Sequence, residues 1–191
     1  MTGPARAERI MTALPSLTLA VLLACPLGAA AQEAFVPAAA FLQAGASQGT
    51  QSFTAGLAWD LPYAWTLGTA RIESRLEASY AWWQIRSGDR DGISHLSQLA
   101  LIPALRYRSA HGSPWFFEAG LGVTVTSSVY RTRRRRFSTA FNFGTHLAVG
   151  RSFGAQRQHE VSLRFEHFSN AGIRHPNPGA NFVQLRYERR F

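Results

Sequence analysis

The chain has 191 residues, a formal net charge of +9 and a sequence pI of about 11.1, and all of its basic residues except histidine are arginine. This length is typical of one compact domain, and the charge indicates an anionic partner, because arginine binds phosphate and carboxylate through paired hydrogen bonds. After the first 31 residues no run of 18 or more apolar residues occurs, which excludes a membrane-spanning helix there.

Residues 1–31 are predicted to be a secretory signal peptide. Arginines come first, an apolar core follows, and the segment ends on small residues at Ala31. A lipoprotein signal with lipidation at Cys25 is the alternative, disfavoured because a proline follows that cysteine. Cleavage before Gln32 would remove the only cysteine and leave a mature chain without disulfides. Export also argues against nucleic acid as the anionic partner.

Residues 32–191 alternate apolar and polar side chains in segments of about ten residues separated by turns. In an exported chain this pattern predicts an all-β fold, an eight-stranded antiparallel transmembrane β-barrel of the bacterial outer membrane. A soluble β-sandwich is the alternative. The chain ends on Phe191, an aromatic residue on an alternating strand, which resembles the C-terminal targeting pattern of bacterial outer-membrane proteins. The predicted strands are Phe35–Ala46, Gln51–Asp60, Ile72–Ile85, His95–Tyr107, Trp115–Tyr130 and Phe137–Phe153, followed by two within Val161–Phe191.

Three features between the predicted strands carry further expectations. Leu61–Trp65 is predicted to be an aromatic turn at the membrane boundary. Pro103 predicts a β-bulge, because proline cannot donate to a strand ladder. The run Arg131–Arg136 is predicted to be a strongly basic loop.

The even number of strands places both termini at the same end of the barrel. For outer-membrane barrels that end is periplasmic, and short turns are expected there. The turns at 61–70, 110–114 and 154–159 then lie in the periplasm, and the connections at 131–136 and 171–180 lie outside.

The seventh predicted strand places a histidine and a serine in line with its apolar side. His167 and Ser169 have the same parity as Val161 and Phe165, so they are predicted to face lipid near the outer rim. These residue types are the usual base and nucleophile of acyl transfer. The alternative is an ordinary surface pair without a chemical role. At this depth an exposed serine would meet the acyl esters of lipid A in the lipopolysaccharide leaflet.

The run from His167 to Gly172, HFSNAG, is followed by Pro176, Asn177 and Gly179 and by an aromatic C-terminal strand. This hairpin resembles the lipid A 3-O-deacylase family of outer-membrane enzymes. The upstream segments LAWD, FEAGLGV and FNF, which begin at Leu57, Phe117 and Phe141, look like segments of the same family in order, so the resemblance covers about residues 35–191.

The resemblance implies that the enzyme hydrolyses the ester at the 3-position of lipid A, with Ser169 as nucleophile and His167 as general base and acid. The family's third member is a glutamate, and Asn181 stands at the matching position here. An asparagine oxygen can orient the imidazole but cannot stabilise its charged form as a carboxylate does. The predicted oxyanion donors are Asn177, Ala171 and Gly172.

Substrate contacts are predicted on two sides of this pair. Phe141 and Phe143 would line a groove for the acyl chain, with ordinary lipid-facing residues as the alternative. Arg133, Arg134 and Arg135 would bind the lipid A phosphates, with a solvated basic loop as the alternative. No cofactor or metal is expected. Lipopolysaccharide and outer-membrane lipids are the expected partners, and the oligomeric state, including a homodimer, stays open.

Two other functions remain as alternatives. A purely structural or adhesive barrel would make His167 and Ser169 incidental. A lipid A acyltransferase usually carries an N-terminal amphipathic helix, and the absence of one between Gln32 and Phe35 disfavours it.

Overall fold

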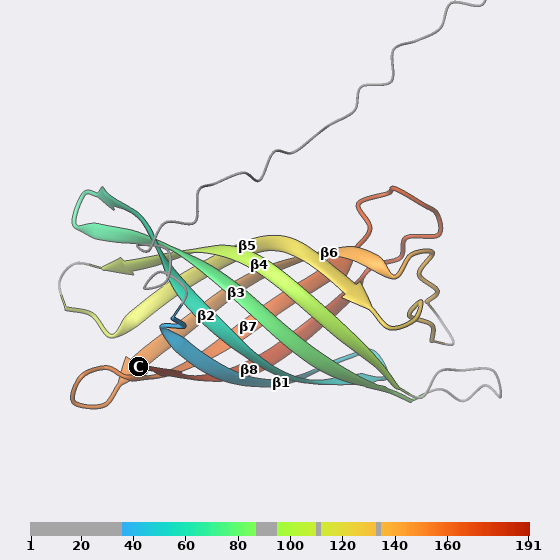
Figure 1. Ribbon diagram of the computed structural model, residues 1–191, viewed down its shortest axis with the longest axis horizontal. Helices are drawn as coiled ribbons and strands as arrows, with labels where there is room; N and C mark the ends of the chain where they lie inside the picture. Colours follow the sequence, from blue (N-terminus) through green and yellow to red (C-terminus); the bar gives the residue numbers. More distant parts are fainter. Residues whose placement is uncertain (1–35, 87–94, 110–111, 133–134) are drawn as a thin grey trace, which may run out of the picture. The chain divides into compact units, whose positions relative to one another are not determined.

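The computed structural model describes residues 36–86, 95–109, 112–132 and 135–191, in which eight antiparallel strands close into one barrel (Figure 1). Each strand pairs with its neighbours in sequence, and β1 pairs with β8, so no edge is left open. This confirms the predicted fold. The predicted signal peptide, residues 1–31, lies outside the described residues. The strands are β1 Ala39–Ser47, β2 Thr50–Leu67, β3 Ala70–Ile85, β4 His95–Ser109, β5 Trp115–Thr126, β6 Phe141–Phe153, β7 His159–Ser169 and β8 Ala180–Arg190.

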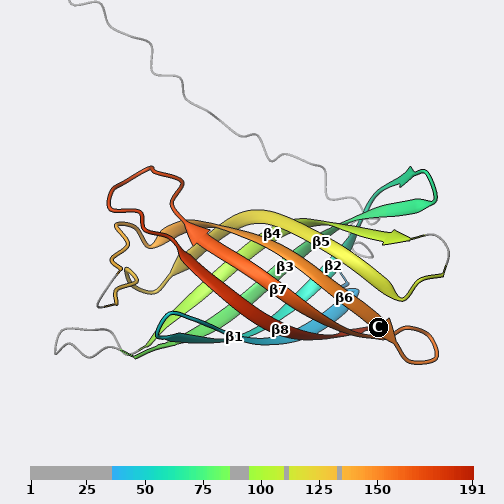
Figure 2. The ribbon, with the colours of Figure 1, turned by 180° about the vertical axis from the view of Figure 1, so that it is seen from behind.

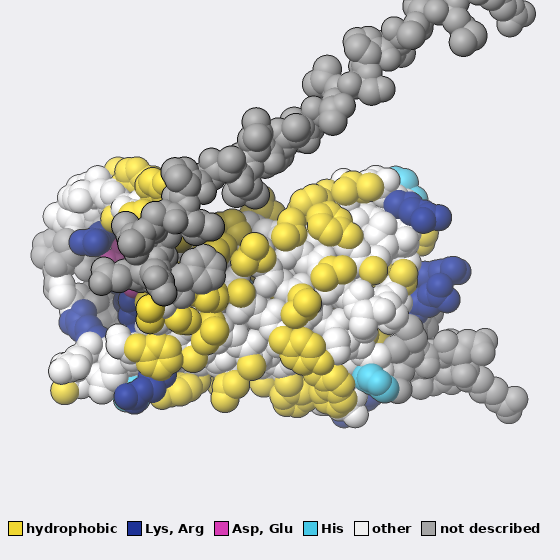
Figure 3. All heavy atoms as spheres, in the orientation of Figure 1, with side chains coloured by type: hydrophobic (Ala, Val, Ile, Leu, Met, Phe, Trp, Pro, Cys, Tyr) yellow, Lys and Arg dark blue, Asp and Glu magenta, His cyan; other side chains and the backbone are white. Residues whose placement is uncertain are grey.

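The strand pattern separates an apolar exterior from a polar interior. On β7, Val161, Leu163 and Phe165 are exposed, whereas Ser162 and Arg164 between them are buried. Figure 3 shows apolar side chains spread over the middle of the wall and arginine side chains gathered toward its two ends. Such an exterior suits a surrounding lipid phase, as expected of an outer-membrane barrel. Within the described residues no helix is long and apolar enough to cross a membrane.

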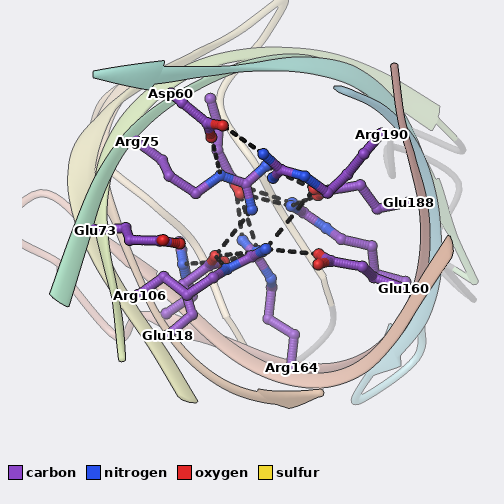
Figure 4. A network of polar contacts seen from close by, with 12 residues as sticks. Asp60, Glu73, Arg75, Arg106, Glu118, Glu160, Arg164, Glu188 and Arg190 are labelled. Atoms are coloured by element: carbon purple, nitrogen blue, oxygen red, sulfur yellow. Dashed lines mark hydrogen bonds and ion pairs between the residues drawn. The ribbon is translucent and has the colours of Figure 1, made fainter. Parts of the chain in front are cut away.

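The interior of the barrel is filled by an ion-pair network (Figure 4). The Arg164 guanidinium lies 2.6 Å from a Glu118 oxygen and 3.0 Å from a Glu77 oxygen. Arg106 reaches Glu118 at 2.7 Å, and Arg75 reaches the same carboxylate at 3.3 Å. An eight-stranded barrel is just wide enough to be packed by its own side chains, and here charged pairs do the packing.

A second interior layer is aromatic. Trp83 is surrounded by Phe182, Phe168 and Tyr130, at ring-centroid distances of 4.7, 5.2 and 5.4 Å. Phe137 packs against Tyr130 at 5.1 Å. We call this cluster the aromatic plug. Burial raises the pKa of the Tyr130 phenol above its ordinary value, and its hydroxyl is hydrogen-bonded to Thr50 at 2.7 Å. The plug therefore stays uncharged and closes the interior behind β7 and β8.

The predicted turn at Leu61–Trp65 is wrong. β2 continues through this segment to Leu67, with a register irregularity between Asp60 and Ala64. The Tyr63 carbonyl accepts a hydrogen bond from the Ser74 hydroxyl at 2.5 Å, so the irregular backbone is still held to β3. The reversal comes at Gly68, whose φ of 59° suits glycine.

Two further expectations on strand detail are corrected. The pairing of β4 has the same register on both sides of Pro103, so this proline makes no bulge. β5 ends at Thr126 and β6 begins at Phe141, which shortens both predicted strands. Phe137 is not part of a strand, because its side chain turns inward into the aromatic plug.

Alternate connections lie at opposite ends of the barrel (Figures 1 and 2). The end that carries the connections after β1, β3, β5 and β7 is called the loop end. The terminal end carries Phe191 and the turns after β2, β4 and β6. The predicted grouping of 131–136 with 171–180 at one end is therefore correct for the described part of these connections.

Candidate active site

His167 and Asn181 face each other across the β7–β8 pair at the loop end. The His167 Nδ1 and Asn181 Oδ1 atoms are 2.6 Å apart. Because an amide oxygen only accepts, Nδ1 must carry the proton in this hydrogen bond. In the neutral imidazole Nε2 is then left as the proton acceptor, which is the state that a general base needs.

Ser169 lies two residues beyond His167 on the same side of β7, opposite Phe143 of β6. Both side chains are partly exposed, in line with the exposed Val161, Leu163 and Phe165. Among the residues that the structure describes, no hydrogen bond joins the Ser169 hydroxyl to His167. Catalytic hydrogen bonds are often long before substrate binds, so a side-chain rotation of Ser169 would have to complete this contact.

The wall behind this pair is rigid. Phe168 and Phe182, which alternate with His167 and Asn181 along the strands, point inward into the aromatic plug and are 3% and 0% exposed. Ala180 is also fully buried. Close packing on the inner side fixes the backbone from which the outer side chains project.

The β7–β8 connection is organised by Asn170, a residue that the sequence did not single out. Its amide nitrogen donates to the Ser138 hydroxyl at 3.0 Å, to the Thr139 hydroxyl at 3.2 Å and to the Arg174 carbonyl at 2.8 Å. Its side-chain oxygen accepts from the Gly172 N–H at 3.0 Å. Asn170 is 1% exposed. Its position in a Ser-Asn-Ala-Gly run, typical of a turn, could have indicated this role from the sequence.

The predicted oxyanion donors differ in their availability. The Gly172 N–H is engaged by Asn170, so it is not free in this conformation. The Asn177 oxygen accepts from the Asn170 N–H at 3.1 Å, which fixes the orientation of the Asn177 amide. Within the described part of the chain, the Ala171 N–H and the Asn177 NH₂ group donate no hydrogen bond. These two donors lie in the loop that follows Ser169.

Arg135 is connected to the site through the backbone of Gly179. Its guanidinium donates to the Gly179 carbonyl at 2.6 Å. Gly179 has a φ of 63°, and a β-carbon built on it would lie 2.7 Å from Cε1 of His167. Only glycine can bring its backbone this close to the imidazole. Arg133 and Arg134, the neighbouring predicted phosphate ligands, lie outside the described residues.

The two predicted aromatic residues lie beside Ser169. Phe141 and Phe143 pack edge to face with their ring centroids 5.4 Å apart, and Phe143 pairs directly with Ser169 across β6 and β7. Phe141 is 44% exposed on the outer wall. They form an apolar surface next to the hydroxyl.

A groove of about 530 Å³ leads away from the site across the outer wall. Thr145, which pairs with His167, lies at its border. The groove extends over β6, β5 and β4. The small residues Ala119 and Gly120 of β5 are part of its lining. Its apolar wall residues include Leu105, Leu121, Leu147 and Phe165.

Within the described residues, the interior brings together a group of potential metal ligands that the sequence did not reveal. Ligand atoms of Glu77, Glu118 and His146 lie within 4.8 Å of one another. The two carboxylates are already paired with Arg164 and other arginines of the network, so a cation would have to compete with fixed positive charges. This cluster is separated from His167 by the barrel wall, since all three side chains point inward.

Comparison with known proteins agrees with this arrangement. Residues 53–190 match the family model of lipid A 3-O-deacylase, PagL. The lipid A deacylase PagL of Bordetella bronchiseptica is 38% identical over 133 residues, which cover 70% of each chain. The lipid A deacylase PagL of Pseudomonas aeruginosa is 31% identical over 177 residues, covering 92% of this chain and 96% of that protein.

The fold has a solved relative as well. The crystal structure of the outer-membrane enzyme PagL superposes with a TM-score of 0.68 at 27% identity, covering 81% of this chain and all of that chain. The match to the family model runs from within β2 to the end of β8 and includes the β7–β8 hairpin that carries His167, Ser169 and Asn181. The chain therefore belongs to the lipid A 3-O-deacylase family, whose members are outer-membrane enzymes.

Proposed function

We propose that this protein hydrolyses the 3-O-linked acyl ester of lipid A, with Ser169 as nucleophile and His167 as base, on the lipid-facing wall of the barrel. The observation that carries this proposal is the hydrogen bond from His167 Nδ1 to Asn181, which leaves Nε2 as an acceptor on the face that Ser169 shares. Family membership supplies the substrate class.

The reaction proceeds in two acyl transfers. The Ser169 oxygen attacks the ester carbonyl while His167 Nε2 takes the hydroxyl proton. The tetrahedral intermediate collapses, the ester C–O bond breaks, and His167 returns the proton to the departing 3-oxygen of the sugar. Water then attacks the acyl-serine with the same histidine as base, which releases the fatty acid and restores Ser169.

The negative charge of the intermediate needs donors that are already in place. The Ala171 N–H and the Asn177 amide are the donors of choice, because both follow Ser169 closely and neither donates to another described residue. The fixed Asn177 oxygen supports this role, since its bond to the Asn170 N–H prevents the amide from turning away.

The outer groove beside Thr145 would hold the departing acyl chain. Strands lie about 4.8 Å apart, so a groove from β7 to β4 spans roughly 14 Å, which accommodates much of a fatty acyl chain. Phe141 and Phe143 would cover the chain near the carbonyl. Arg135 and the other arginines of its loop would face the lipid A phosphates if the loop end lies in the outer leaflet.

Lipid A mass spectrometry on cells that express the protein tests this function. The wild-type protein should remove one 3-linked acyl chain, and Ser169→Ala should leave lipid A unchanged. Ser47→Ala is the matched control, because Ser47 is also a partly exposed serine at the loop end. Removal of the 3-linked acyl chain by the Ser169→Ala variant would refute the serine mechanism. A gain in lipid A mass would favour the acyltransferase.

A further inference from the structure

A cluster of basic side chains lies on the outer wall at the terminal end, far along the strands from His167. His159 pairs directly with Arg189 across β7 and β8. Arg151 pairs with Val161, two residues from His159, and so lies diagonal to it. Directly opposed β-carbons are about 5 Å apart and diagonal ones about 7 Å apart, so the three groups form one patch. We call Arg151, His159 and Arg189 the basic rim patch.

The basic rim patch has no acidic partner on its own face. Glu160 and Glu188, the acidic residues of these strand ends, are 2% and 1% exposed and pair inside the barrel with Arg106 and Arg75. Among the described residues, Arg151 and Arg189 form no ion pair, although both are exposed. The inner face of the same strands thus has matched charges, and the outer face carries two uncompensated guanidinium groups.

Aromatic side chains hold this patch at the boundary of the apolar wall. The rings of Phe153 and His159 stack at 5.4 Å, and those of His159 and Tyr187 stack at 6.0 Å. His159 Nδ1 and the Tyr187 hydroxyl are hydrogen-bonded at 2.7 Å, which fixes the orientation of the imidazole. Arg151 lies over the ring of Trp115 at 5.9 Å. Tyrosine and tryptophan favour this boundary, where one end of the ring meets water.

An apolar groove begins next to the patch. It has a volume of about 360 Å³ and is bordered by Val149 and Leu163, which lie two residues from Arg151 and Val161 on the same face. Phe117 and Val183 also line it. The groove is distinct from the one beside Thr145, with which it shares Leu147 and Phe165 only.

We propose that the basic rim patch and this groove together bind one anionic glycerophospholipid. The phosphate lies between the planar guanidinium groups of Arg151 and Arg189 and accepts paired hydrogen bonds from them, with His159 as a further donor. One acyl chain fills the groove along Val149 and Leu163. The site lies at the opposite end of the strands from His167, so the bound lipid is not the substrate of the proposed esterase.

Native mass spectrometry of the full mature protein in detergent, titrated with phosphatidylglycerol, tests the site. The Arg151→Ala/Arg189→Ala double variant should bind this lipid at least about tenfold more weakly, because four charge-assisted hydrogen bonds are lost. Arg71→Ala is the matched control: Arg71 is an exposed arginine at the terminal end that has its own partner, Glu73 at 3.1 Å, and its variant should bind as the wild type does. Unchanged binding by the double variant would overturn the proposal.

Two further measurements separate the contribution of the lipid phosphate to binding from that of the lipid acyl chain. Val149→Trp fills the groove and should weaken binding of phosphatidylglycerol while both arginines remain. Inorganic phosphate alone should not displace the lipid, because the groove contributes to affinity. Displacement by inorganic phosphate would show a free-anion site and refute the lipid assignment. If the double variant does not fold, the single variants Arg151→Gln and Arg189→Gln, which keep the side-chain stem, replace it. Each should also bind phosphatidylglycerol more weakly than the wild type.

Discussion

At the scale of single residues, we expect Asn181 to determine how well His167 can act as the proposed base. The Asn181 Oδ1 atom lies 2.6 Å from His167 Nδ1 and accepts its proton in a hydrogen bond. An amide oxygen carries no full charge to balance an imidazolium in the transition state. A charge-assisted hydrogen bond contributes roughly 1 kcal/mol more than a neutral one, which corresponds to about fivefold in rate.

The Asn181 variants test this role directly. Asn181→Glu should raise kcat about fivefold, since a carboxylate stabilises the protonated histidine. Asn181→Ala should lower kcat about tenfold or more, because the ring loses its orientation. Deacylation of lipid A in detergent micelles, measured at saturating substrate, gives both values. An alanine variant with wild-type kcat would exclude an orienting role for Asn181.

Gly179 makes a second test at this scale, because a β-carbon at this position would collide with the imidazole of His167. Gly179→Ala would place a methyl group 2.7 Å from His167 Cε1 and should lower kcat about tenfold or more. Gly172→Ala is the matched control: Gly172 also has a positive φ, 81°, but a β-carbon there meets nothing within 4 Å. Both variants carry about 1 kcal/mol of backbone strain, and only the first displaces the histidine. Equal activities in the two variants would contradict the contact.

At the scale of elements, the site depends on contact between two connections, the one after β5 and the one after β7. Ser138 donates to the Arg174 carbonyl at 2.8 Å, and Arg135 donates to Gly179 at 2.6 Å. The first of these connections is fixed to the barrel by Tyr130 and Phe137, whose rings belong to the aromatic plug. The aromatic plug thus links the connection after β5 to the inner side of the strands that carry His167 and Asn181.

Arg135 should therefore act on the rate as well as on substrate binding. Arg135→Ala should lower kcat several-fold, because the Gly179 carbonyl loses its hydrogen bond and the backbone next to His167 is no longer held in place. Arg135→Lys keeps one donor for the carbonyl and should recover part of the rate. Arg136→Ala removes an exposed neighbour that has the same charge and should leave kcat unchanged. Rates of the two alanine variants over a range of lipid A concentrations give kcat and KM separately, and a change in KM alone in both variants would disprove a positioning role for Arg135.

At the scale of the whole molecule, local periodicity was sufficient to predict the barrel. Alternation along β7 assigns Val161 and Phe165 to one face and Arg164 to the other without knowledge of any partner strand. Contacts between distant segments could not be read in this way. Arg135 and Gly179 are 44 residues apart in sequence, and nothing local shows that an arginine predicted to meet phosphate also donates to a distant backbone carbonyl.

The dependence on contacts between distant segments also explains why the predicted turn at Leu61–Trp65 is wrong. Proline and aromatic residues there have the composition of a turn, but β2 pairs with β3 as far as Leu67. Strand pairing overrode the local signal, as tertiary context often does. The wrong interpretation lay at the terminal end, so it left the predicted faces of β7 and β8 intact.

The interior network supports a prediction about the barrel as a unit. Glu118 is 3% exposed and neutralises Arg75, Arg106 and Arg164 together. Glu118→Gln would leave these buried guanidinium groups short of one negative charge, which should lower the free energy of unfolding by about 3 kcal/mol or more. The urea midpoint of the barrel refolded into lipid vesicles measures the change.

Glu73→Gln is the control for this prediction, because Glu73 is partly exposed and pairs with the exposed Arg71 and the partly exposed Arg108, so its loss should cost less than that of the fully buried Glu118. The Glu118→Gln barrel, once folded, should keep its kcat. His167 and Ser169 lie on the outer face and are backed by the aromatic plug rather than by the ion pairs. A large loss of kcat at full folding would mean instead that the charged interior controls the geometry of the outer wall.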